Sequence, residues 1–181
     1  MKTFGRVLTA MITSFNEDGS VNIENSVAIA EHLLNHGSDG LVVCGTTGEN
    51  PTISRESKIA LFKAVAEFCG DKGTIIANVG SNDTKGSVDF VKEVSAIPGI
   101  DGLLVVVPYY NKPNQQGQYL HFKSIAEATT IPIMVYNVPS RVGTGIFPAT
   151  LARLHNEYPH ICAIKEASGN LMIASEIKRL M

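Results

Sequence analysis

Runs of consecutive apolar residues recur about every thirty residues along this chain, and each run is followed by a segment with the periodicity of an amphipathic helix. A strand that is apolar at every position is buried on both faces, which is typical of a parallel sheet covered by helices. The pattern predicts six βα units of an α/β protein. Strands are expected at residues 5–13, 40–44, 74–79, 103–107, 131–138 and 161–165, and helices at residues 22–36, 54–70, 83–96, 116–128, 148–156 and 170–180.

Two architectures are built from repeated βα units, an open doubly wound sheet and a closed (β/α)8 barrel. Polar side chains follow the predicted strand ends at Thr46, Tyr110, Tyr136 and Lys165. In a barrel these ends converge on one mouth, whereas in an open sheet they lie along an edge. We therefore expect the barrel. Because a complete barrel takes about 250 residues, the sequence predicts a single domain, 1–181, that is an incomplete barrel of about six βα units, truncated at the C-terminus.

Composition and spacing argue against several classes of function. A formal net charge of −2 gives no reason to expect nucleic acid or an anionic membrane as a partner. The sequence has neither a signal peptide nor an apolar run of membrane-spanning length, so we expect a cytoplasmic protein. The cysteines have no CxxC spacing, which argues against a disulfide framework or a zinc site. His32 and His36 lack the glutamate of HExxH, so we expect a solvated helix face rather than a metal site.

The apolar strand at residues 161–165 ends in a lysine and is followed by a turn of small residues. Burial removes water from an ammonium group, which lowers its pKa and increases the fraction of free amine. A free amine attacks carbonyl groups, so Lys165 is a candidate Schiff-base lysine. The alternative is a lysine that extends to water or pairs with Glu49 or Glu166.

Four segments, in this order along the chain, resemble those of the dihydrodipicolinate synthase family, also called the 4-hydroxy-tetrahydrodipicolinate synthases. That family belongs to the pyruvate-dependent class I aldolases, and its fold is a (β/α)8 TIM barrel. The likeness runs from the first predicted strand to the helix after Lys165. The segments are residues 45–49 (GTTGE), 108–111 (PYYN), 136–141 (YNVPSR) and 164–169 (IKEASG).

The resemblance implies catalytic roles for four residues. Lys165 would form the imine with pyruvate, and Tyr136 would be the general acid and base. Thr46 and Tyr110 would complete a hydroxyl relay between Tyr136 and solvent. In the family this second tyrosine reaches across a dimer interface, so the resemblance implies a homodimer or homotetramer. No metal or organic cofactor is expected, because the imine itself accepts the electrons.

The resemblance also implies the substrate-binding residues. Thr47 and Gly48 would hold the carboxylate of pyruvate, and Arg141 would clamp the carboxylate of L-aspartate 4-semialdehyde. The predicted activity is therefore a lyase-type condensation in lysine and diaminopimelate biosynthesis. Two alternatives stay open. One is another pyruvate-dependent aldolase, such as an N-acetylneuraminate or 2-keto-3-deoxy-sugar-acid lyase. The other is a truncated homologue without catalytic activity.

Relatives that are inhibited by lysine carry histidines and an acidic residue in an allosteric pocket. At the corresponding positions this sequence has Arg55, Lys58 and Gly86. Two cations and a glycine cannot neutralise the ammonium group of the ligand. The sequence therefore predicts weak inhibition by lysine, or none.

Overall fold

The computed structural model of the protein describes residues 4–181, so the first three residues of the predicted domain lie outside the described residues. The chain divides into two compact units. Unit 1 comprises residues 4–78 and 93–103, and unit 2 comprises residues 79–92 and 104–181. The helix α3 (Thr84–Ser95) and the strand β4 (Gly102–Val106) each contribute residues to both units.

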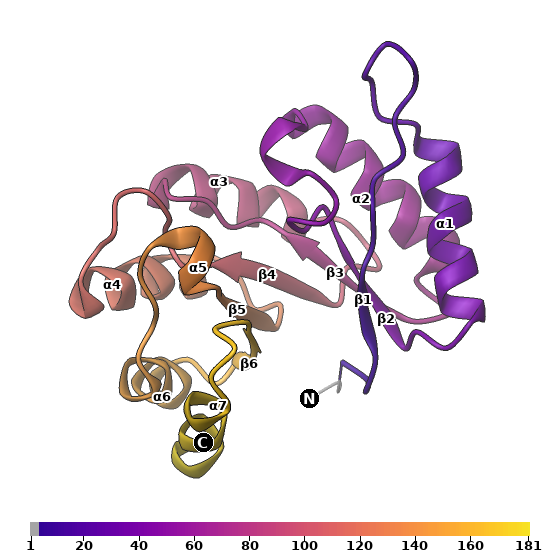
Figure 1. The fold of residues 1–181 in the computed structure, drawn as a ribbon. Coiled ribbons are helices and arrows are strands. Elements are labelled where there is room, and N and C mark those ends of the chain that lie inside the picture. Colours follow the sequence, from indigo (N-terminus) through magenta and orange to yellow (C-terminus); the bar gives the residue numbers. More distant parts are fainter. Residues whose placement is uncertain (1–3) are drawn as a thin grey trace. The chain divides into compact units, whose positions relative to one another are not determined.

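Unit 1 is built on parallel strands. Residue Leu8 of β1 pairs with Gly40 of β2, and Gly40 pairs in turn with Thr74 of β3. Every residue of β2 and β3 is buried, as the unbroken apolar runs predicted. The helices α1 and α2 lie side by side (Figure 1). The elements are β1 (Leu8–Ala10), α1 (Ile23–Asn35), β2 (Gly40–Val43), η1 (Asn50–Thr52), α2 (Arg55–Cys69) and β3 (Thr74–Asn78).

Unit 2 continues the alternation of strand and helix. The N–H of Val107, just after β4, donates to the carbonyl of Tyr136 in β5, and β5 pairs in parallel with β6. The helices α6 and α7 are neighbours (Figure 1). Besides β4, the elements are α4 (Gln115–Ala126), β5 (Ile133–Asn137), α5 (Pro139–Val142), α6 (Pro148–Glu157), β6 (Ile161–Glu166) and α7 (Leu171–Leu180).

Helix starts follow the capping residues of the sequence. The hydroxyl of Ser54 accepts a hydrogen bond from the N–H of Ser57, so α2 begins at Arg55 as predicted. The side chain of Asn22 caps α1 in the same way. Two short helices were not predicted, η1 and α5. Each carries a proline in its first turn, where the missing N–H costs no hydrogen bond.

The first strand is shorter than predicted, three residues instead of nine. Before β1, the N–H groups of Arg6 and Val7 both donate to the carboxylate of Asp39, and the Val7 carbonyl accepts from the Asp39 N–H, so a single residue rather than a strand ladder holds this segment. After β1, the side chain of Thr13 donates to the carbonyl of Gly48. Such hydrogen bonds from side chains replace those between neighbouring strands, and a prediction from the spacing of apolar residues does not take them into account.

His32, in the last turn of α1, and His36, the C-cap residue of this helix, are both exposed, as expected. The ring Nδ1 of His36 is 2.7 Å from the carbonyl oxygen of His32, and the two rings stack. Within residues 4–181, no cluster of three or more metal-ligating side chains is found. None of the helices in the described part of the chain is both long and apolar enough to cross a membrane.

Candidate active site

The strands β5 and β6 bring Lys165 and Tyr136 together. The two residues are register partners in the parallel pair, so their side chains project from the same face of the sheet. The Lys165 Nζ lies 4.6 Å from the centroid of the Tyr136 ring. Tyr136 is 7% exposed, and Lys165 is half-buried. An amine and a phenol therefore share one partly desolvated position at the carboxyl ends of these strands.

Burial lowers the pKa of Lys165 below the usual lysine value, because the ammonium form loses hydration. The carboxylate of Glu166, one of the two ion-pair partners considered for this lysine, is engaged elsewhere. It accepts hydrogen bonds from the side-chain amide of Asn137 and from the N–H of Ser168, each at 2.7 Å. Glu166 points to the opposite face of the strand, so it does not hold Lys165 in its charged form.

Tyr110 lies on the loop that follows β4, next to the strand that carries Tyr136. Its side chain is 88% exposed. The loop is tied to the start of α3, because the Asn111 side chain donates to the Asn82 carbonyl and accepts from the Asn82 side chain. Tyr110 therefore lies exposed at the surface on a loop that is held in place.

Arg141 lies in α5, directly after β5, and its side chain is exposed. The segment that follows α5 is held by two amide side chains from the first turn of α4. Gln115 donates to the Gly145 carbonyl and accepts from the Phe147 N–H, and Gln118 also donates to the Gly145 carbonyl. These bonds fix the chain just after the helix that carries Arg141.

Thr46, Thr47 and Gly48 belong to unit 1 and form the turn between β2 and η1. Thr46 and Thr47 are exposed, and Gly48 is buried. The Gly48 N–H donates to the Gly45 carbonyl at 3.0 Å, so that group is already used within the turn. A Cβ at Gly48 would lie 3.0 Å from the Thr13 hydroxyl and 3.1 Å from the Met11 carbonyl oxygen. A side chain at position 48 would thus crowd Thr13 and Met11, and Thr47 presents the exposed polar groups.

Backbone strain is concentrated at these two loops. Among the described residues, the non-glycine residues with positive φ angles flank the threonines or lie around Tyr110. Such conformations cost of order 1 to 3 kcal/mol each and are common at functional sites. The residues are Cys44 (φ 53°), Glu49 (57°), Tyr110 (66°) and Lys112 (46°).

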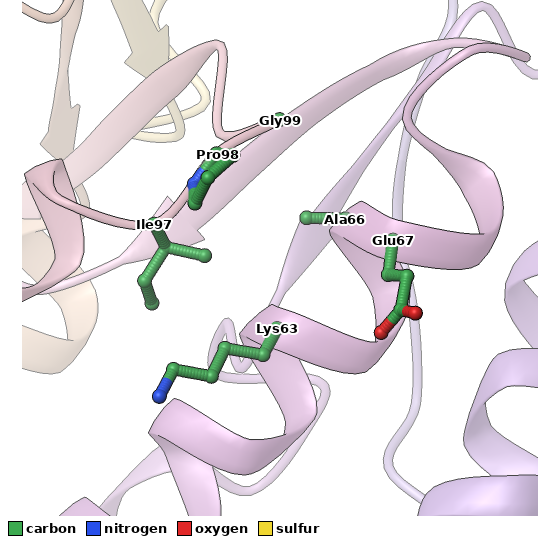
Figure 2. Close-up of a pocket in the computed structure, with 6 residues that line it drawn as sticks. All are labelled: Lys63, Ala66, Glu67, Ile97, Pro98 and Gly99. Atoms are coloured by element: carbon green, nitrogen blue, oxygen red, sulfur yellow. The ribbon is translucent and has the colours of Figure 1, made fainter.

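A cavity of about 430 Å³ in unit 1 contains none of the predicted site residues. Figure 2 shows Lys63, Ala66 and Glu67 on α2 facing the segment 97–99. Lys63 and Glu67 carry opposite charges on the exposed face of α2. This cavity is therefore distinct from the candidate active site.

Three further residues support the site and were not singled out from the sequence. Asn137, Gln115 and Gln118 are amides that hold the ends of β5 and β6 and the segment after α5. Asn137 and Gln118 are buried, at 1% and 0% exposure. An asparagine next to a tyrosine at a strand end is typical of a turn, and its hydrogen-bond partners lie far away along the chain, so a sequence pattern does not indicate them.

Comparison with known proteins places the chain in a family. The model of the dihydrodipicolinate synthetase family matches residues 3–181. The chain is 50% identical over 178 residues to a 4-hydroxy-tetrahydrodipicolinate synthase of Desulforamulus reducens, covering 98% of this chain and 60% of that protein. It is 51% identical to the same enzyme of Moorella thermoacetica, covering 97% of this chain and 60% of that protein.

A solved dihydrodipicolinate synthase of Bacillus anthracis superimposes on the chain with a TM-score of 0.96 and 40% identity, covering 100% of this chain and 61% of that one. The chain spans about 60% of the length of the curated relatives it matches. The predicted TIM-barrel fold class is confirmed, with six βα units present. The chain belongs to the dihydrodipicolinate synthetase family.

Proposed function

We propose that the chain carries the imine-forming site of a 4-hydroxy-tetrahydrodipicolinate synthase. The substrates are pyruvate and L-aspartate 4-semialdehyde, and the product serves lysine and diaminopimelate biosynthesis. The observation that carries the proposal is the position of the Lys165 amine, half-buried with a lowered pKa and 4.6 Å from the centroid of the Tyr136 ring.

The first step is imine formation. The free amine of Lys165 attacks the C2 carbonyl of pyruvate, and the C2–O bond breaks as water leaves. The oxygen leaves with two protons: the phenol of Tyr136 passes on the proton lost by nitrogen, since a phenol both donates and accepts, and the other proton comes from solvent. The protonated imine then draws electrons from the methyl group, which loses a proton to give an enamine.

The second step forms the carbon–carbon bond. The enamine carbon attacks the aldehyde carbon of L-aspartate 4-semialdehyde, and the aldehyde oxygen takes a proton. We propose that Arg141 binds the carboxylate of this substrate with its two-pronged guanidinium group. The exposure of Arg141 and the fixed segment that follows it support this assignment.

The remaining residues bind pyruvate or transfer protons. Thr47 binds the pyruvate carboxylate through its hydroxyl, in the turn that Gly48 allows to pack closely. Thr46 and Tyr110 carry protons between Tyr136 and solvent. Because Tyr110 is 88% exposed, we propose that it completes the relay of a second copy of the chain, in a homodimer or homotetramer.

No metal or organic cofactor is part of the proposal, because the imine of Lys165 accepts the electrons that the reaction displaces. The family's enzymes belong to amino-acid biosynthesis, and we propose a cytoplasmic location with no nucleic acid or membrane partner. We also propose that residues 1–181 form part of one barrel domain.

The test is a steady-state assay of the purified protein with pyruvate and each candidate second substrate. We expect turnover with L-aspartate 4-semialdehyde and none in the cleavage of N-acetylneuraminate or 2-keto-3-deoxy-sugar acids. Arg141→Ala should raise the KM for the semialdehyde and leave binding of pyruvate unchanged. Preferred cleavage of a sugar acid would assign the chain to the other aldolases, and no turnover with any substrate would support a non-catalytic homologue.

A further inference from the structure

The end of the β5–β6 pair contains two consecutive rungs, that is, two pairs of residues that face each other across the strands, and the two pairs carry different functional groups. Tyr136 pairs with Lys165, and the next rung pairs Asn137 with Glu166. Because successive side chains of a strand point to opposite faces, the first rung lies on the active-site face and the second on the other face. The second rung is closed by a hydrogen bond from the Asn137 amide to the Glu166 carboxylate, at 2.7 Å.

The pairing upstream of these rungs is irregular. Ile133 pairs with Ile161, but the next residue, Met134, pairs with Ala163, so Cys162 has no register partner. An extra residue of this kind is a β-bulge, which leaves one residue unpaired and interrupts the hydrogen-bond ladder locally. A slip by one residue would move Lys165 to the opposite face of β6, away from Tyr136.

Asn137 and Glu166 are also bound to the loops that follow their strands. The side-chain oxygen of Asn137 accepts a hydrogen bond from the Ile146 N–H. The Glu166 carboxylate oxygen that does not bind Asn137 accepts from the Ser168 N–H. Asn137 is 1% exposed, so a broken bond there leaves a buried polar group without a partner. One partly buried contact thus connects both strand ends and both loops.

We propose that Asn137 and Glu166 are positioning residues that hold Lys165 in register opposite Tyr136 after the bulge. They act through the backbone of β6 and do not touch the substrate. The proposal rests on the imine chemistry proposed for Lys165. It adds the hydrogen bond that keeps the amine on the active-site face.

The direction of the Asn137–Glu166 hydrogen bond provides the test. In Asn137→Asp, two carboxyl groups face each other and can form this bond only while they share a proton. As the pH rises, the shared proton is lost, the groups repel and the rung opens. In the double variant Asn137→Asp with Glu166→Gln, the new amide at 166 donates to the new carboxylate at 137. The bond is restored with its direction reversed, and the contacts to Ile146 and Ser168 are kept.

The readout is the rate at which pyruvate and sodium cyanoborohydride place a carboxyethyl group on Lys165, measured by mass spectrometry from mildly acidic to mildly alkaline pH. In the wild-type protein this rate rises with pH, because the free amine fraction of Lys165 rises. We expect the rate of Asn137→Asp to fall with pH, to about a tenth of the wild-type rate or less at the alkaline end, as expected for loss of a buried hydrogen bond. The double variant should recover at least half of the wild-type rate and its pH profile.

Asn114→Asp is the matched control. It makes the same change of amide to acid within unit 2, at the N-cap of α4, where an acidic side chain can still accept from the Gly117 N–H. Its profile should follow the wild-type protein. A wild-type profile for Asn137→Asp, or a double variant as slow as the single one, would overturn the proposal.

Hydrogen exchange of the peptide 161–168 separates this proposal from the proposed function. Faster exchange in Asn137→Asp than in the wild-type protein at alkaline pH, reversed in the double variant, supports the role in register even if the wild-type protein forms no adduct. No adduct in the wild-type protein would contradict the imine chemistry. Equal exchange in all variants would contradict the positioning role.

Discussion

The Lys165 Nζ lies 4.6 Å from the centroid of the Tyr136 ring, and the two residues face each other on neighbouring strands in register. Their proximity follows from strand pairing and not from a loop, so it is fixed by backbone hydrogen bonds. The lysine is half-buried and its pKa is lowered. An amine that is free more often than usual therefore lies beside a group that can transfer protons.

Replacing Tyr136 by phenylalanine should separate binding from proton transfer. Tyr136→Phe keeps the ring beside Lys165 and removes only the hydroxyl group. We expect turnover to fall by about 10² to 10⁴, the usual contribution of a general acid and base. Pyruvate should still be trapped on Lys165 by borohydride, more slowly. Unchanged turnover would remove Tyr136 from the mechanism.

The turn before η1 should tolerate a methyl group at Gly45 but not at Gly48. A Cβ at Gly48 would lie 3.0 Å from the Thr13 hydroxyl, whereas a Cβ at Gly45 would meet only a Val42 methyl group at 3.5 Å. We expect Gly48→Ala to lower the free energy of unfolding by roughly 1 to 3 kcal/mol, as overpacking does, and Gly45→Ala to change it little. Urea unfolding of both variants tests this, and equal stabilities would show that the contact at Gly48 relaxes freely.

Buried His121 should make the protein sensitive to mild acid. Burial lowers its pKa from 6.5 to about 4, and its Nδ1 lies 2.8 Å from the Thr84 hydroxyl. Between these two values the unfolded chain binds a proton that the folded chain does not, so stability falls as the pH falls from 6.5 to about 4. The full loss is about 3 kcal/mol.

His121→Asn retains a hydrogen-bonding group near the Nδ1 position and cannot be protonated, so its stability should change less with pH over this window. His36→Asn, at an exposed histidine, is the control and should keep the wild-type dependence. Urea unfolding measured at intervals from pH 7 to pH 4 compares the three proteins. The same slope in His121→Asn as in the wild-type protein would assign the acid sensitivity to other groups.

Inhibition by lysine should be weak. The guanidinium group of Arg55 donates two hydrogen bonds to Glu93, at 2.9 and 2.7 Å, and Lys58 is a second cation nearby in the sequence. The Glu93 carboxylate is already bound by Arg55 and Lys58 adds positive charge, so these positions offer the ammonium group of a lysine ligand a poor partner. Initial rates with increasing L-lysine test the prediction, and an inhibition constant in the micromolar range would contradict it.

The sequence predicted every strand and every long helix, because the spacing of apolar residues and the capping residues determine secondary structure within a short stretch of chain. The α2 helix begins after Ser54 as its hydroxyl dictates. The sequence also placed Lys165 and Tyr136 at strand ends. It could not predict the bond from Asn137 to Glu166, because that contact joins residues 29 positions apart and depends on the register after the bulge. Nor could a sequence motif predict that the Gly48 N–H donates to a carbonyl of its own turn.

The most direct test of the account is trapping of the imine on the intact protein. The wild-type chain and Lys165→Met are incubated with pyruvate and sodium borohydride, digested and analysed by mass spectrometry. We predict one carboxyethyl group on Lys165 in the wild-type protein and none on the variant, with Lys63 on the exposed face of α2 unmodified in both. A folded wild-type protein that gives no adduct at Lys165, or the same adduct at Lys63, would contradict the proposed chemistry.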